Sequence, residues 1–475
     1  MEFSTMRKIT VLSACLLLIT NAVTKAQSRQ TDQVVEEYHL QQLEAELDWL
    51  REPIQFQPSG GDEFHAETIP ETLPPANLAS YPSEIFESCA SDSTFSPTIK
   101  IGGFFQADSG WFNQSPLNIA SVGDAQDGAD IRRARLNAKG NIAENVSYML
   151  DIDFAFLNRT NLADVWLQLN ETLPWGDVRI GYFRQPIGLD ALTSVTETTF
   201  LERNLTLAMV PFRQIGVELH HVASDLRSTR SISTYRFPTD FRGGYVGDNG
   251  GYGIAGRWTC LPFRKQQADR LFHFGSAFTF ADSGNDLVRY ASSPEFFLIE
   301  NGGAFFAPPD VPSSTPLFVD TGPVPANNFG MITTELAGIR GPMHYQTETV
   351  FLTVNTIGTG RSQFFGTSAQ IGYFLTGEVK IYDFQSGVLS RITPRCPVRK
   401  CQGIGAWEVA ARWSYLDLND DAIKGGRLND LTLGINWYWN RHTRFQLNYI
   451  KAYLDDSGFG DSDAGIVALR AQIDF

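Results

Sequence analysis

Segments in which apolar and polar residues alternate recur along the last four fifths of the chain. The clearest of them ends the sequence, where Val467, Leu469 and Ile473 fall on one side of an extended segment. Arg470 and Gln472 fall on the other side. Because successive side chains of a strand point to opposite faces, this period of two predicts a strand with one apolar face.

Counting such segments predicts sixteen strands in an all-β domain. They cover residues 99–112, 130–140, 145–157, 162–170, 176–184, 212–222, 229–237, 251–259, 270–281, 329–340, 344–356, 364–376, 404–416, 429–439, 443–454 and 465–475. An even number allows antiparallel strands to close into a barrel with both chain ends on one side. Sixteen strands leave an aqueous channel in the centre.

The alternation suits two opposite arrangements, a soluble sandwich with its apolar face inside or a membrane barrel with its apolar face outside. Three features favour the membrane barrel: an export signal, aromatic residues at predicted strand ends such as Trp111 and Trp437, and unequal connections. Short connections such as 141–144 and 440–442 alternate with long ones such as 238–250 and 282–328. We therefore predict a 16-stranded antiparallel transmembrane β-barrel over residues 97–475.

Three segments precede the predicted barrel. Residues 1–26 have the basic start, the apolar centre and the small-residue cleavage site of a secretory signal peptide. Residues 33–52 carry leucines spaced three and four apart, which predicts a short coiled-coil helix for oligomerisation. Residues 53–96 are punctuated by proline without periodicity, which predicts an extended linker.

Composition and charge narrow the class of protein further. The chain has 34 Phe, 15 Tyr and 9 Trp, and its net charge of −15 argues against nucleic acid as a partner. Residues 27–96 hold 14 acidic and 2 basic side chains, so most of the negative charge precedes the barrel. The seven histidines stand in no catalytic signature, and no Cys/His spacing suits zinc. We therefore expect neither an enzyme nor a cofactor. In an oxidising compartment, Cys396 and Cys401 predict a small disulfide ring, with two free thiols as the alternative.

Six motifs occur in the order in which a known family has them. They are Ile131–Leu136 (IRRARL), Gly181–Leu189 (GYFRQPIGL), Phe200–Leu205 (FLERNL), Leu375–Glu378 (LTGE), Gly405–Glu408 (GAWE) and Leu433–Tyr438 (LGINWY). In this respect the chain resembles the phosphate-selective porin O and P family over roughly residues 99–475. The resemblance implies a homotrimer in the bacterial outer membrane, a third loop folded into the pore, and arginines along the path of small anions such as phosphate.

Basic residues are the candidate site of such a pore. By alternation, Arg133, Arg135, Lys139, Arg179 and Arg412 face the lumen, as does Arg470. The family resemblance assigns Arg132, Arg133 and Arg203 to the anion path. Guanidinium groups suit phosphate because they stay charged and offer forked donors. The alternative is that these charges hydrate the pore and pair with Asp151, Asp153 and Glu408.

Two departures from the family pattern bear on selectivity. Ala191 and Trp111 stand where we expect basic residues in phosphate-specific members. We therefore predict passive diffusion of small hydrophilic solutes with a mild anion preference, phosphate or polyphosphate being candidate solutes. Residues 185–211 are the candidate constriction loop. The alternative function is structural: the helix at 33–52 would tether the outer membrane to the cell wall by binding peptidoglycan.

Overall fold

The computed structural model describes residues 95–475 apart from 156–159, 174–175, 240–247, 249, 266–268, 299–313, 400–402, 421 and 457. The predicted signal peptide, coiled-coil helix and linker lie outside the described residues, apart from residues 95–96 at the end of the linker. Cys401 also lies outside them, so the disulfide ring with Cys396 stays a prediction.

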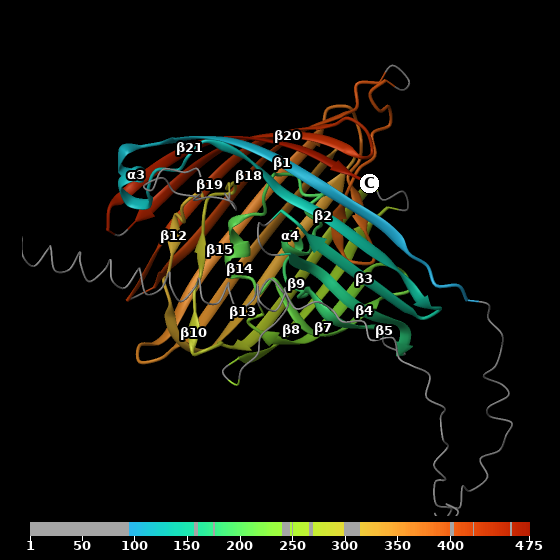
Figure 1. Ribbon diagram of the computed structural model, residues 1–475, viewed down its shortest axis with the longest axis horizontal. Helices are drawn as coiled ribbons and strands as arrows, with labels where there is room; N and C mark the ends of the chain where they lie inside the picture. The colour runs from blue at the N-terminus through green and yellow to red at the C-terminus, as the bar shows by residue number, and fades with distance from the viewer. Residues whose placement is uncertain are drawn as a thin grey trace, which may run out of the picture. The chain divides into compact units, whose positions relative to one another are not determined.

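Sixteen long antiparallel strands form a closed barrel (Figure 1), which confirms the predicted fold. Each strand pairs with the next one along the chain, and the last pairs with the first, where Asp108 lies opposite Arg470. The strands are β1 (Lys100–Gln114), β2 (Gly128–Ala143), β3 (Val146–Asp153), β4 (Asn161–Leu173), β5 (Gly176–Arg184), β6 (Arg213–Val222), β7 (Ser228–Phe237), β8 (Gly251–Arg264), β9 (Arg270–Asp282), β13 (Val324–Arg340), β14 (Met343–Thr356), β15 (Gly360–Phe374), β18 (Ala406–Asp420), β19 (Ile423–Tyr438), β20 (Thr443–Asp456) and β21 (Gly460–Asp474).

The remaining elements are short and lie in the connections. They are α3 (Pro116–Val122), α4 (Leu189–Leu192), the 3-10 helix η1 (Leu205–Met209), β10 (Leu287–Val288), β11 (Ala291–Ser292), β12 (Val319–Asp320), β16 (Ile381–Asp383) and β17 (Val388–Ser390). Within the described part of the chain, no helix has the length and apolar character needed to cross a membrane.

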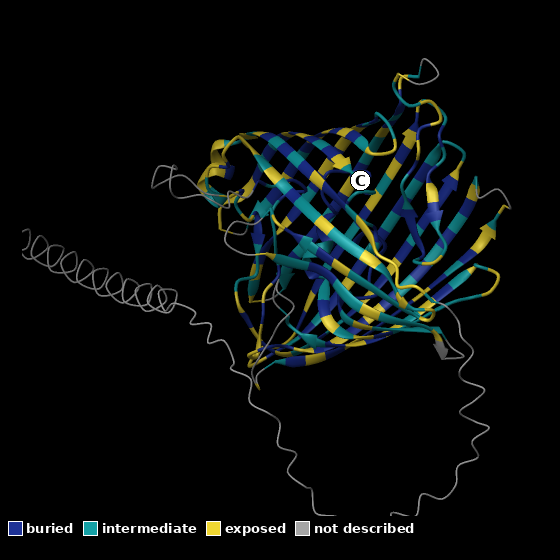
Figure 2. Ribbon diagram, turned by 45° about the vertical axis from the view of Figure 1, so that its right-hand side comes forward, coloured by how far each residue is buried: buried dark blue, intermediate teal, exposed yellow. Residues whose placement is uncertain are grey.

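The barrel wall has its apolar side chains outside and its polar side chains inside. On β19, Leu431 and Leu433 are 45% and 51% exposed, whereas Asp430 and Thr432 are fully buried. The same alternation of exposed and buried residues covers the strands in Figure 2. A soluble sandwich would bury the apolar rows instead, so this arrangement confirms the predicted membrane barrel.

The two ends of the barrel differ in their connections. We call the end that holds the C-terminus the turn end, and the opposite end the loop end. At the turn end, hairpins such as β2–β3 and β13–β14 are joined by two residues. The three longest connections have buried residues: 185–212 and 283–323 start from the loop end, and 375–405 starts from the turn end. These connections decide which side chains face the open part of the lumen.

Candidate functional site

The connection 185–212 is folded into the lumen. After β5 the chain passes Pro186 and turns at Gly188, whose φ of +76° is accessible to glycine at little cost. Phe200 is fully buried and Leu201 is 2% exposed, and η1 contacts strands β14, β15 and β18 on the far wall. The predicted constriction loop is therefore correctly placed.

A carboxylate on the far wall holds this loop. Glu348 on β14 accepts a hydrogen bond from the backbone N–H of Asp190 at 3.0 Å and from Nδ2 of Asn204 at 2.9 Å. The Asp190 carboxylate in turn accepts from the Asn204 backbone N–H at 2.9 Å. Because these groups are buried and satisfy one another, they fix the loop in one position.

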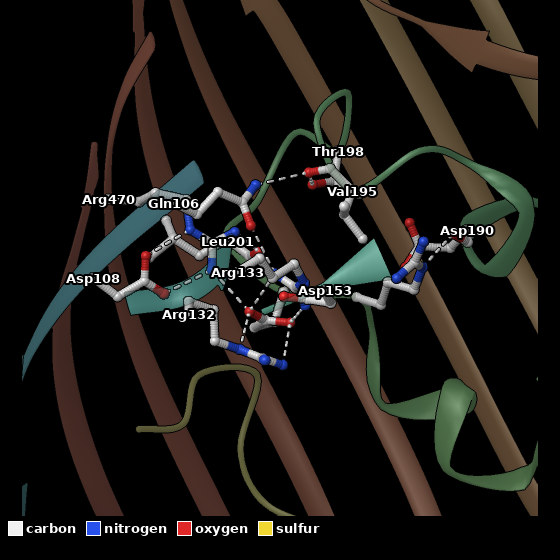
Figure 3. Close-up of polar contacts among 12 residues, drawn as sticks. Gln106, Asp108, Arg132, Arg133, Asp153, Asp190, Val195, Thr198, Leu201 and Arg470 are labelled. Atoms are coloured by element: carbon white, nitrogen blue, oxygen red, sulfur yellow. Dashed lines mark hydrogen bonds and ion pairs between the residues drawn. The ribbon is translucent and has the colours of Figure 1, made fainter. Parts of the chain in front are cut away.

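On the opposite wall, Glu202 of the same loop binds three arginines. Its carboxylate lies 3.0 Å from Arg132, 2.8 Å from Arg133 and 2.8 Å from Arg470. Arg470 also forms a two-pronged ion pair with Asp108, with both distances 2.7 Å. Figure 3 shows the guanidinium groups of Arg132, Arg133 and Arg470 converging on this point. The cluster joins the loop to the strands that close the barrel.

A β-bulge explains how two consecutive arginines reach the same carboxylate. Gln106 on β1 lies opposite Arg133, but the next residue, Ala107, lies opposite Ile131. Arg132 is thus an extra residue on β2, and it points inward together with Arg133. Simple alternation would have turned Arg132 toward the lipid, whereas the bulge places it where the family resemblance implies.

The charges of this cluster shift the pKa of Glu202. Burial by itself would raise the pKa of the Glu202 carboxyl. The surrounding charges of Arg132, Arg133 and Arg470 outweigh burial and hold this pKa well below its ordinary value. Glu202 is therefore ionised and cancels part of the positive charge of the arginines.

Most other candidate arginines are also paired with carboxylates. Arg135 binds Asp153 at 2.8 Å and Asp151 at 3.5 Å, and Arg179 binds Glu218 at 3.2 Å. Arg412 pairs at 2.6 Å with Glu295 of the connection 283–323. Glu408, which the alternative also named as a partner of the lumen charges, binds His344 instead. Lys139 is exposed and lies close to the turn end of β2.

Arg184 and Arg203 differ from these arginines. Arg203 donates to the backbone carbonyls of Asp190 at 2.9 Å and Thr193 at 2.7 Å. Arg184 donates to the same Thr193 carbonyl at 3.0 Å, and to Leu192 at 2.7 Å. Neither guanidinium forms an ion pair with a carboxylate among the residues that the structure describes. Burial lowers the pKa of Arg203 most, and the positive charge of Arg184 lowers it further. Two adjacent positive charges thus have no direct carboxylate partner, although the charges of Asp164 and Asp190 act on Arg184 and Arg203 from nearby.

Two cavities meet at this place. The loop-end cavity has a volume of about 760 Å³, and the turn-end cavity has about 380 Å³. Arg135, Val195, Arg203 and Arg213 line both of them, so the junction between the cavities is formed by three arginines and one valine. A solute that passes from one cavity to the other has to pass these side chains.

Sequence reasoning missed Arg184 and Arg213. Arg184 stands five residues after the inward-facing Arg179, and Arg213 stands five residues before the inward-facing Glu218. Because an odd separation changes the face of a strand, alternation assigns both arginines to the lipid face. The strands end at these residues and the chain folds into the barrel, and both arginines line the cavities. Arg213 pairs with Asp164 at 2.9 Å. The sequence did offer one signal for these two residues, because they stand directly before and after the long connection 185–212 that contains Pro186.

Comparison with known proteins also indicates a membrane channel of the porin type. A family model described as phosphate-selective porin O and P matches residues 99–475. An uncharacterized protein of Caulobacter vibrioides is 28% identical over 426 residues, which are 85% of this chain and 79% of that protein. Porin O of Pseudomonas aeruginosa is 22% identical over 412 residues, 81% of this chain and 90% of that protein.

A solved structure shares the architecture. The anion-selective porin from Comamonas acidovorans superposes with a TM-score of 0.50 at 11% sequence identity, over 80% of this chain and 100% of that one. At this identity the likeness concerns the fold alone. The family match and the closed barrel identify an outer-membrane channel rather than an enzyme. On the match over residues 99–475, the chain belongs to the phosphate-selective porin O and P family.

Proposed function

We propose that the protein is an anion-preferring diffusion channel whose preference is set where the two cavities meet. The observation that carries this proposal is the pair formed by the half-buried Arg184 and the buried Arg203, whose guanidinium groups share the Thr193 carbonyl and have no direct carboxylate partner among the described residues. Unbalanced positive charge in a narrow space that excludes much of the water lowers the electrostatic barrier for anions and raises it for cations.

The charges along the cavities support this location. The loop-end cavity is lined by five arginines and three acidic side chains. The turn-end cavity is lined by seven basic and four acidic side chains, together with the C-terminal residue. A third cavity of about 500 Å³, which shares Arg184 with the turn-end cavity, has no such excess. The proposed selectivity therefore lies at the junction, and not along the whole lumen.

The paired arginines have a different role in this proposal. Arg132, Arg133, Arg135 and Arg179 line the cavities, but each of them binds a carboxylate. Arg412 is 2% exposed and lines none of these cavities. Strong retention of a phosphate ion requires several forked donors that are free at once. A general anion preference, with weak binding at Arg184 and Arg203 and ready release, fits the pairing better than tight phosphate selectivity does.

The test is the reversal potential of the purified full-length protein in a planar bilayer with a potassium chloride gradient. Arg184→Gln and Arg203→Gln should each lower the chloride-to-potassium permeability ratio. Arg427→Gln is the matched control, because Arg427 is an exposed arginine paired with Asp417 and Asp455. Cation preference of the unaltered protein would overturn the proposal, and so would equal effects of all three substitutions.

We also propose that the protein is a homotrimer, as the family resemblance implies. The wall is uneven: β3, β5 and β6 have 8, 9 and 10 residues, whereas β13 and β19 have 17 and 16. A tilted strand needs about 9–11 residues to cross the hydrocarbon layer. The short side meets this length with little or no excess, which suits a side that a neighbouring copy covers. Chemical cross-linking in detergent checks this, and a monomer under mild conditions would contradict it.

A further inference from the structure

The lining of the loop-end cavity has a basic and an apolar part. The basic part consists of the β2 arginines with Arg203 and Arg213. The apolar side chains come from two connections: Leu207 and Phe212 from 185–212, and Pro294, Phe297, Pro316 and Leu317 from 283–323. Leu317 is 44% exposed. An inorganic anion gains nothing from the apolar part, because it has no apolar surface to remove from water.

Aromatic rings lie directly against the cations of this cavity. The guanidinium carbon of Arg203 lies 4.9 Å and that of Arg213 lies 4.7 Å from the ring centre of Phe212. Arg132 lies 4.3 Å from the ring centre of Phe297. These cation–π contacts hold the positive groups next to apolar surface. A ligand with a negative head and an apolar body could contact both at the same time.

The hydrogen-bond donors that are left suit a small anionic head. Arg132, Arg133, Arg135 and Arg213 already bind Glu202, Asp153 or Asp164. Arg203 uses Nε and Nη2 on backbone carbonyls. Among the described residues, Nη1 of Arg203, Nη2 of Arg135 and Nη1 of Arg213 have no hydrogen-bond partner. One guanidinium edge can satisfy a carboxylate, and only a solute with an apolar body also gains from the apolar side chains beside these donors.

We propose that the preferred solutes are amphipathic organic monoanions, namely carboxylates with an aromatic or branched aliphatic body. This inference rests on the anion preference proposed above. The apolar body lies against Phe212, Phe297 and Leu317, and the carboxylate approaches Arg203. Arg184, which shares the Thr193 carbonyl with Arg203, then receives the carboxylate on the turn-end side. Both sites are single charges, so the solute is released again.

The experiment compares benzoate, acetate and phosphate with chloride in bi-ionic reversal-potential measurements on the full-length protein. Benzoate should be more permeant than acetate although it is larger and diffuses more slowly. Phosphate should block the chloride current more weakly than benzoate does. Leu317→Ser should reduce the benzoate-to-acetate permeability ratio by about threefold, because part of the apolar contact is lost.

A matched control lies in the same connection. Leu287 is 45% exposed and is not part of the cavity wall, so Leu287→Ser should leave the benzoate-to-acetate ratio unaltered. Acetate permeating at least as well as benzoate, or phosphate blocking more strongly than benzoate, would overturn the organic-anion proposal while the anion preference in potassium chloride stands. Cation preference in potassium chloride would instead remove the proposed function itself.

Discussion

Arg132 and Arg133 are consecutive residues of one strand, and both bind the carboxylate of Glu202 inside the barrel. The β-bulge at Arg132 makes this geometry available. As a consequence, the carboxylate of the constriction loop reduces the positive charge of the very residues that the family resemblance assigns to the anion path.

Removing this carboxylate should increase the anion preference. In Glu202→Gln the guanidinium groups of Arg132, Arg133 and Arg470 lose part of their balancing charge, so the chloride-to-potassium permeability ratio should rise. Breaking a buried ion pair costs about 3–5 kcal/mol, so the loop should also be held less firmly. Reversal potentials measure the first effect. Asp455→Asn, at a 46% exposed carboxylate, is the control, and an unchanged ratio in Glu202→Gln would contradict the expectation.

The lowered pKa of Glu202 predicts the pH dependence. The pKa of the Glu202 carboxyl is lower in the folded protein than in the unfolded chain. Its ionised form therefore stabilises the folded protein fully at any pH above the ordinary pKa, and this stabilisation is lost as the pH falls through the lowered pKa. The difference in reversal potential between the unaltered protein and Glu202→Gln should therefore stay constant from about pH 8 to about pH 5. A midpoint within that range that is absent from the variant would show that Glu202 titrates normally.

The two unlike roles of Arg133 and Arg203 can be separated by alanine substitutions. Arg203→Ala removes an unbalanced charge and should lower the anion conductance clearly, whereas Arg133→Ala leaves Glu202 bound to Arg132 and Arg470 and should have a smaller effect. The double variant should resemble Arg203→Ala, and the resistance of the barrel to heat should be nearly unchanged. Single-channel conductance and gel mobility of unheated samples measure these quantities. A larger loss in Arg133→Ala than in Arg203→Ala would reverse the assignment.

The Glu348 anchor predicts the effect of loosening the constriction loop. In Glu348→Gln one carboxylate oxygen becomes an amide that faces the donors of Asp190 and Asn204, at a cost of about 1–3 kcal/mol. The loop should leave its position more often, which gives a larger and noisier single-channel conductance. Glu144→Gln, at an exposed turn between β2 and β3, should behave as the unaltered protein does. Identical current traces for both variants would show that the anchor does not hold the loop.

The apolar outer face predicts a stability change that depends on depth in the membrane. Leu433→Arg, in the middle of β19, should reduce the free energy of unfolding by about 2–4 kcal/mol. Leu375→Arg, just after β15 at the turn end, is 61% exposed and should cost about 1 kcal/mol or less. Denaturant unfolding in lipid vesicles measures both. Equal costs at the two depths would mean that Leu433 does not contact acyl chains.

Most of the wall could be predicted from local alternation. Side-chain period two identified all sixteen strands, and the inner position of Arg133, Arg135 and Arg412 follows from it because a strand keeps its faces over its whole length. The ordered motifs added the family, and with it the inward position of Arg132 and Arg203. These features depend on neighbours in the sequence or on patterns within one segment.

The chemistry of the lumen was decided by contacts between distant segments. Alternation cannot indicate the bulge that turns Arg132 inward, nor the strand ends where Arg184 and Arg213 leave the lipid face. Which arginines keep an unbalanced charge depends on Glu202 and Glu295, two carboxylates that reach the wall from connections folded into the barrel. Because pairing energies act over a few ångströms in space rather than along the chain, the sequence determined where the positive charges stand, and only the tertiary structure decided which of them remain available to a passing anion.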